Sequence, residues 1–195
     1  MADDLAVLTV PDAAGWRGWL SEHHNRSRGV WLVLSKQGAV NPTRLTYDQA
    51  LEEALCFGWI DGQIRAGDEA TYRQRFTPRR ARSAWSRRNV AIVERLSEEG
   101  RMHPPGVAQV ERAKSDGRWE AAYAGAASMT VPHDLASALE AQPAAREMFD
   151  ALSTRNRYAV LYRIETAKRA ETRRKRIESF VAMLARGETI HPQAR

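Results

Sequence analysis

The sequence contains one cysteine, Cys56, among its 195 residues. No disulfide can therefore form within a single chain, which favours a reducing compartment. No stretch approaches the ~18 consecutive apolar residues that a membrane-spanning helix needs. The first residues, Met1-Ala2-Asp3-Asp4, are acidic where a secretory signal would be basic, so we expect a cytoplasmic protein. Because Cys56 lies in an apolar run, we interpret it as a core residue and not as a nucleophile.

Motifs that bind nucleotides or metals are missing as well. The sequence has neither G-x-x-x-x-G-K nor G-x-G-x-x-G, which argues against the common phosphate-binding loops. Its five histidines are scattered, without a C-x-x-C or H-E-x-x-H partner, so we expect no metal site and no cofactor. The G-x-S-x-G motif that presents the nucleophile of α/β hydrolases is also absent.

Acidic residues are missing from one particular segment. Residues 70–93 contain seven arginines and no aspartate or glutamate, so this segment alone carries +7. The whole chain carries +6, which leaves the rest of it close to neutral. A local excess of positive charge predicts an anionic partner more directly than a charge spread evenly over the surface does.

The hydrophobic pattern predicts an α+β fold, a small and mainly antiparallel sheet covered by helices. Residues 30–34 are β-branched and apolar between two glycines, as in a buried strand. Residues 59–65 and 70–76 read as two strands of a hairpin. Helices in this part of the chain are expected over residues 13–24, 47–57, 87–99, 105–115 and 118–124.

The second strand of the hairpin alternates between two kinds of side chain. Tyr72, Gln74 and Phe76 should share one face of the sheet, because successive side chains of a strand point to opposite faces. Arg73 and Arg75 should share the other face. We therefore expect a basic face and an apolar face on this strand.

A helical region is predicted after the small, polar residues 125–130. Its helices are expected over residues 133–141, 143–151, 154–165 and 169–186, with capping and proline signals at several starts. We therefore divide the chain into an α/β body, residues 1–130, and a helical C-terminal region, residues 131–195, that packs on the body.

The acid-free segment follows a predicted strand with a single acid, Asp61, and it combines rigid aromatic rings with guanidinium groups and a helix start. Guanidinium groups bind carboxylates and phosphates bidentately, and the first turn of a helix adds N–H donors. We predict that this segment binds an anionic or polar small molecule. The expected ligand-binding residues are Trp59, Tyr72, Arg73, Arg75, Arg79, Arg80, Trp85, Ser86 and Asn89.

Asp61 has two possible roles in this hypothesis. It could hold an arginine in place, and we expect it within ion-pair distance of Arg75, Arg79 or Arg80, because an unpaired buried carboxylate is costly. Alternatively, it could be the catalytic acid or base of a small-molecule enzyme with an arginine clamp. A nucleic-acid-binding protein is the third possibility, and a purely structural Asp–Arg pair beside a solvated basic strand is the fourth.

Two blocks of the sequence resemble the YdeI/OmpD-associated family, also called bacteriocin-protection proteins. The first is Leu55-Cys56-Phe57-Gly58-Trp59-Ile60-Asp61-Gly62 with Arg75-Phe76-Thr77-Pro78-Arg79-Arg80 and Trp85-Ser86. The second runs from Asn156-Arg157-Tyr158 to Arg173-Arg174-Lys175-Arg176-Ile177, in the helical region. The resemblance implies a protective or resistance protein of bacteria, and it brings no catalytic mechanism with it.

Overall fold

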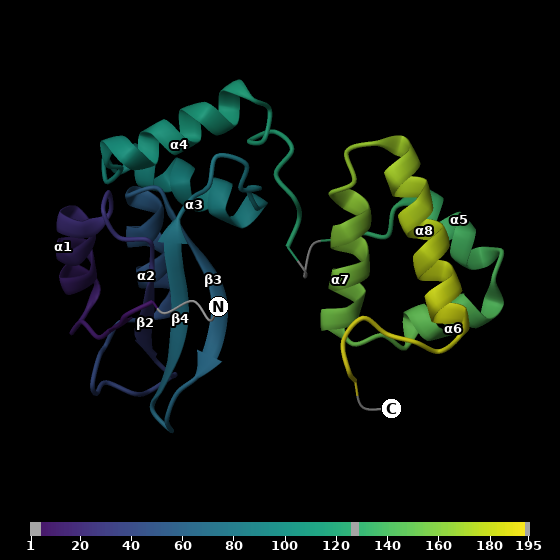
Figure 1. Cartoon of the computed structure of the whole chain (residues 1–195), viewed down its shortest axis with the longest axis horizontal. Helices are drawn as coiled ribbons and strands as arrows, with labels where there is room; N and C mark the ends of the chain where they lie inside the picture. The colour runs from purple at the N-terminus through teal and green to yellow at the C-terminus, as the bar shows by residue number, and fades with distance from the viewer. Residues whose placement is uncertain (1–4, 126–128, 194–195) are drawn as a thin grey trace. The chain divides into compact units, whose positions relative to one another are not determined.

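The computed structural model describes residues 5–125 and 129–193 of the chain (Figure 1). In these residues it has a four-stranded sheet, eight helices and two compact units, Met1–Ala122 and Tyr123–Arg195. The prediction of an α+β fold with a helical C-terminal region is confirmed. None of the helices in the described part of the chain is long and apolar enough to cross a membrane.

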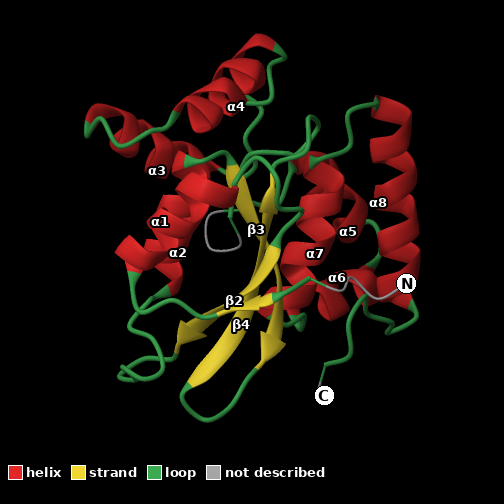
Figure 2. Cartoon of the chain, turned by 60° about the vertical axis from the view of Figure 1, so that its left-hand side comes forward, coloured by secondary structure: helices red, strands yellow, loops and turns green. Residues whose placement is uncertain are grey.

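The first unit is built on a sheet with the strand order β1-β2-β4-β3 (Figure 2). β4 pairs antiparallel with both β2 and β3, so the predicted hairpin is confirmed, while β1 lies parallel to β2. β1 was not predicted, because a strand of two residues is too short to show an alternating pattern. The strands are β1 Val7–Leu8, β2 Val30–Ser35, β3 Trp59–Ala66 and β4 Thr71–Pro78.

Four helices accompany this sheet, and their starts follow from local sequence. Asp12 accepts a hydrogen bond from the Gly15 amide at 3.1 Å, and Thr46 with Gln49 forms a reciprocal capping box. Ser86 accepts a hydrogen bond from the Asn89 amide in the same way. The helices are α1 Ala13–His23, α2 Tyr47–Cys56, α3 Arg87–Glu98 and α4 Pro104–Ser115.

The helix predicted over residues 118–124 is wrong, because residues 118–121 form turns and residues 122–124 are not helical. Gly117 has a φ of 74°, a left-handed backbone conformation that stops α4. The amide of Trp119 then donates to the carbonyl of Ala113 at 3.1 Å, so the chain folds back onto the helix.

The core of the first unit lies between α1, α2 and one face of the sheet. Val30, Leu32 and Leu34 of β2 point to this face and are directly opposite Phe76, Gln74 and Tyr72 of β4. The predicted alternation along β4 is therefore confirmed. It is the reason that the arginines of β4 lie on the opposite face of the sheet.

The second unit is helical and has a hydrophobic core of its own, which includes Leu135, Phe149, Leu161, Ile164 and Leu184. Ser153 accepts a hydrogen bond from the amide of Asn156 at 3.3 Å and so caps a helix, as the sequence predicts. The four helices of this unit are α5 His133–Glu140, α6 Pro143–Asp150, α7 Thr154–Glu165 and α8 Ala170–Ala185.

Candidate functional site

Asp61 does not form the predicted ion pair. Its carboxylate accepts a hydrogen bond from the hydroxyl of Tyr47 at 3.0 Å, and within residues 5–125 and 129–193 no arginine lies within ion-pair distance of it. The register of the sheet explains this result. Asp61 is directly opposite Phe76 and shares its face, whereas Arg75 is one residue away and therefore points to the other face.

The helix-free face of the sheet in this unit gathers three arginines around one tryptophan. Arg75 of β4 is directly opposite Trp31 of β2, and Arg73 is directly opposite both Val33 of β2 and Arg65 of β3. We call Trp31, Arg65, Arg73 and Arg75 the arginine face. Arg73 and Arg75 belong to the predicted site, but Arg65 was missed because it precedes the acid-free segment.

Within the arginine face, the indole N–H of Trp31 lacks a hydrogen-bond acceptor, and Arg65 and Arg73 lack a carboxylate partner, among the described residues. The guanidinium carbon of Arg65 lies 4.0 Å from the ring centre of Trp31, a cation–π contact. Trp31 is only 2% exposed, and its indole N–H has no hydrogen-bond partner among the described residues. Arg65 and Arg73 have no carboxylate partner in that part of the chain either. A buried N–H donor and two exposed cations therefore occur together without an acceptor.

Arg79 lies apart from this face and is buried. It is 5% exposed, its guanidinium carbon lies 3.6 Å from the ring centre of Trp85, and its Nη1 donates to the carbonyl of Ala84 at 3.2 Å. Trp85 in turn contacts Trp119, with ring centres 4.9 Å apart. Arg79 and Trp85 are therefore held in the interior of the first unit and not at its surface.

We predict that Arg79→Ala lowers the free energy of unfolding by about 2 kcal/mol, because a desolvated cation–π contact contributes roughly this much. Arg80→Ala is the matched control. Arg80 is exposed, and exposed substitutions usually change stability by less than about 0.5 kcal/mol. Urea denaturation of the two variants measures the difference. If both variants lose the same free energy of unfolding, the stacking of Arg79 on Trp85 does not contribute to stability.

The remaining predicted ligand-binding residues lie in separate places. Trp59 is buried in the core, where its indole donates to the carbonyl of His24 at 3.2 Å. Ser86 caps α3 and Asn89 is buried in its first turn. Tyr72 is half-buried on the helix-covered face of the sheet, beside Tyr47. The predicted residues thus occupy the two faces of the sheet, the segment between β4 and α3, and the start of α3.

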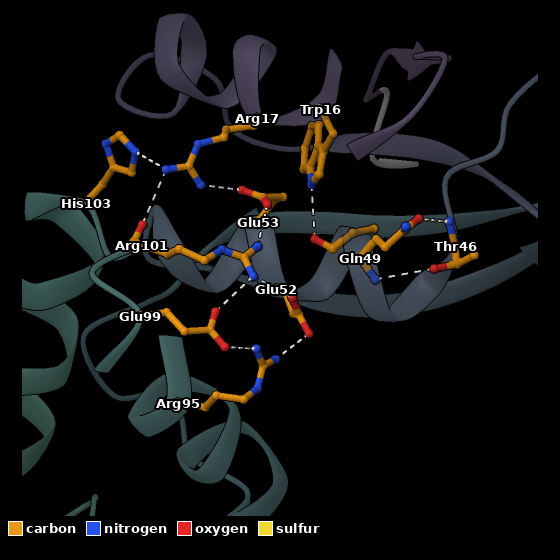
Figure 3. A network of polar contacts seen from close by, with 11 residues as sticks. Trp16, Arg17, Thr46, Gln49, Glu52, Glu53, Arg95, Glu99, Arg101 and His103 are labelled. Carbon is orange, nitrogen blue, oxygen red and sulfur yellow. Dashed lines mark hydrogen bonds and ion pairs between the residues drawn. The ribbon is translucent and has the colours of Figure 1, made fainter. Parts of the chain in front are cut away.

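An ion-pair network that the sequence analysis missed joins α1, α2 and α3 to the loop before α4 (Figure 3). The carboxylate of Glu53 is 6% exposed and accepts from Arg17 and Arg101, at 2.7 Å each. Glu52, the next residue of α2, pairs with Arg95 at 2.5 Å and with Arg101 at 3.1 Å. These cations already have carboxylate partners, so the network stabilises the fold and does not offer an anion site.

His103 and Cys56 lie at the edge of this network. Arg17 donates to Nε2 of His103 at 2.9 Å, which requires a neutral ring, and burial together with the charge of Arg17 lowers the pKa of His103. Burial, and then the charge of Glu53, raise the pKa of the Cys56 thiol to about 11. A neutral thiol is a poor nucleophile, so Cys56 is a core residue, as its apolar neighbours predict.

No group of three or more His, Cys, Asp or Glu side chains in the described ranges is arranged to hold a metal ion. The arrangement also does not favour an enzyme that combines Asp61 with an arginine clamp from β4, because these side chains point to opposite faces of the sheet. The cations that the register does bring together are those of the arginine face.

Two family models match the chain. One is described as a domain of unknown function, DUF8412, and matches residues 8–109. The other is described as "Bacteriocin-protection, YdeI or OmpD-Associated" and matches residues 128–187. No curated protein and no solved structure matches the chain significantly. The resemblance drawn from the sequence is therefore supported for the helical C-terminal region, whereas its first block falls within the other match.

Proposed function

Since the chain belongs to the DUF8412 family and its C-terminal part matches the bacteriocin-protection model, we propose a protective protein that binds a small anion on its arginine face. The C-terminal match supports the bacteriocin-protection type. The anion, its site and a cytoplasmic location are our proposal. A single, buried cysteine is consistent with a reducing compartment.

The observation that carries this proposal is the pairing of Arg65 with Arg73. The two residues are directly opposite each other on β3 and β4, and neither has a carboxylate partner in the described residues. Like charges directly opposite each other on a sheet are destabilising. An anion between them offsets this repulsion, and the planar guanidinium groups match the geometry of a carboxylate or phosphate.

Trp31 adds a neutral donor to the same site. Its indole N–H is buried and has no acceptor within residues 5–125 and 129–193, and a buried donor without an acceptor is costly. An anion held by Arg65 and Arg73 on this face would supply an acceptor. The site would thus combine two exposed cations with a desolvated donor, a combination that favours a compact oxyanion over an uncharged ligand.

We predict that Arg65→Ala and Arg73→Ala each weaken anion binding about ten- to hundred-fold, since a charged hydrogen bond contributes roughly 1.5–3 kcal/mol. A thermal-shift screen of the full chain with inorganic phosphate, citrate and benzoate selects the probe. Isothermal titration then measures its dissociation constant for each variant.

Arg155→Ala is the control for charge alone, because Arg155 is an exposed arginine of the second unit. Equal losses in all three variants would contradict a specific site and indicate a diffuse polyanion surface. A single-stranded oligonucleotide tests that case. Its affinity should fall with salt by roughly 0.7 log units per contacted phosphate for each log unit of salt.

A further inference from the structure

A second candidate site lies on the helix-covered face of the sheet. The sheet therefore stands between this site and the arginine face. It is an open groove of ≈ 680 Å³ beside the start of α2. Two aromatic rings, Tyr47 and Tyr72, and the side chain of Val40 line it together with Lys36 and Arg44. Pockets of this size accept ligands as large as a drug molecule.

The two tyrosines form an uncharged aromatic wall, and Tyr47 is held in place by its neighbours. The hydroxyl of Tyr47 donates to Asp61, and the guanidinium carbon of Arg88 lies 5.3 Å from the centre of the Tyr47 ring. Burial, and then the charge of Asp61, raise the pKa of Tyr47; burial and the charge of Asp48 raise the pKa of Tyr72. Both hydroxyls therefore stay protonated at neutral pH, and both rings offer an apolar surface with a polar edge.

The rim of the groove is positive. Lys36 donates from its ammonium group to the carbonyl of Asp68 at 2.7 Å, which fixes the charge in place and leaves two of its three N–H donors. Arg44 forms an ion pair with Asp12 at 3.6 Å, but its side chain is 69% exposed and can contact a ligand as well. Within the described residues the lining of the groove contains no acidic side chain.

Val40 gives the groove an exposed apolar surface, since its side chain lines the groove and is 60% exposed. The groove therefore has an apolar floor, an aromatic wall and a cationic rim.

We infer that this groove binds a small organic acid, a molecule with an apolar body and one anionic group. The apolar body lies on Tyr72 and Val40, and the anionic group reaches Lys36 and Arg44. A purely inorganic anion would leave the aromatic wall unused, and a neutral apolar molecule would leave both cations unused. The inference does not depend on the arginine face, because no residue is shared between the two sites.

Two dyes with related aromatic rings test the inference on the full chain. The probes are 8-anilinonaphthalene-1-sulfonate, which carries an anionic group, and N-phenyl-1-naphthylamine, which does not. In a Lys36→Met/Arg44→Met double variant, the sulfonate dye should bind about ten- to hundred-fold more weakly, since charged hydrogen bonds are lost. The neutral dye should keep its affinity. Both substituted side chains are at the surface or on a loop, so the variant is expected to fold, and its melting temperature checks this.

The control variant is Val107→Ala. Val107 lines a different apolar depression, between α3 and α4, to which such dyes could also bind. Val107→Ala should leave both affinities unchanged. The inference is overturned if the double variant binds the sulfonate dye as tightly as the original chain does, or if Val107→Ala causes the larger loss. Dye binding that survives in Arg65→Ala and Arg73→Ala confirms that the groove and the arginine face are separate sites.

Discussion

Replacing Glu53 with alanine is expected to lower the free energy of unfolding by about 3–5 kcal/mol, the usual effect of removing one partner from a buried ion pair. Among the charged residues of this network that the structure describes, Glu53 alone is buried, and its carboxylate holds both Arg17 of α1 and Arg101 of the loop before α4. Without it, the two guanidinium groups lose the carboxylate that they share. Urea denaturation followed by circular dichroism measures the loss.

Two further variants show how much of this loss depends on the negative charge of Glu53 and how much on its buried position. Glu53→Gln keeps the size of the side chain and one acceptor oxygen, so its loss should be smaller than that of Glu53→Ala. Glu99→Ala removes another acid of the same network, at an exposed position, and should have much less effect. If Glu53→Ala and Glu99→Ala destabilise the chain equally, the buried carboxylate is not the centre of the network.

Replacing Gly106 with alanine is expected to destabilise the chain by about 3 kcal/mol, the upper end of the usual effect of overpacking. Gly106 lies in the first turn of α4, and a Cβ atom there would overlap the carbonyl oxygen of Cys56 and approach that of Leu55. Backbone atoms at the end of α2 cannot rotate away as a side chain would. α4 would therefore have to move away from α2, with loss of the packing between them.

Gly18→Ala is the matched control, because it makes the same chemical change inside a helix. A Cβ atom at Gly18 of α1 would meet nothing within 4 Å. This substitution should stabilise the chain by about 0.5–1 kcal/mol, the difference in helix propensity between the two residues. Thermal unfolding of both variants tests the prediction. A stable Gly106→Ala variant would show that α4 does not rest closely on the end of α2.

The parts of the fold that depend on neighbouring residues were predictable from the sequence. The caps at Asp12, Thr46 and Ser86 bind amides three residues away, so a short motif contains the whole interaction. The alternation along β4 is also local, because it depends only on the geometry of an extended chain. The same alternation, with the pairing register, would have placed Asp61 and Arg75 on opposite faces.

The candidate sites were less predictable, because their partners lie far apart in the sequence. Nothing near Asp61 in the sequence indicates that Tyr47 is its hydrogen-bond partner, and nothing near Glu53 indicates both Arg17 and Arg101. Nothing in the sequence distinguishes Arg79 from the exposed arginines around it, yet Arg79 is buried against the ring of Trp85. A count of arginines in a segment therefore measures local charge, and only the register of the strands shows which charges face each other.

The distribution of aromatic residues has a spectroscopic consequence. All six tryptophans lie in the unit Met1–Ala122, whereas the aromatic residues of the unit Tyr123–Arg195 are tyrosines and phenylalanines. Light at 295 nm excites tryptophan selectively, so the emission follows the unfolding of one unit, whereas far-ultraviolet circular dichroism follows the helices of both. Coincident transitions from the two signals mean that the units unfold together. If the transitions are separate, the midpoint of each unit can be measured in the intact chain.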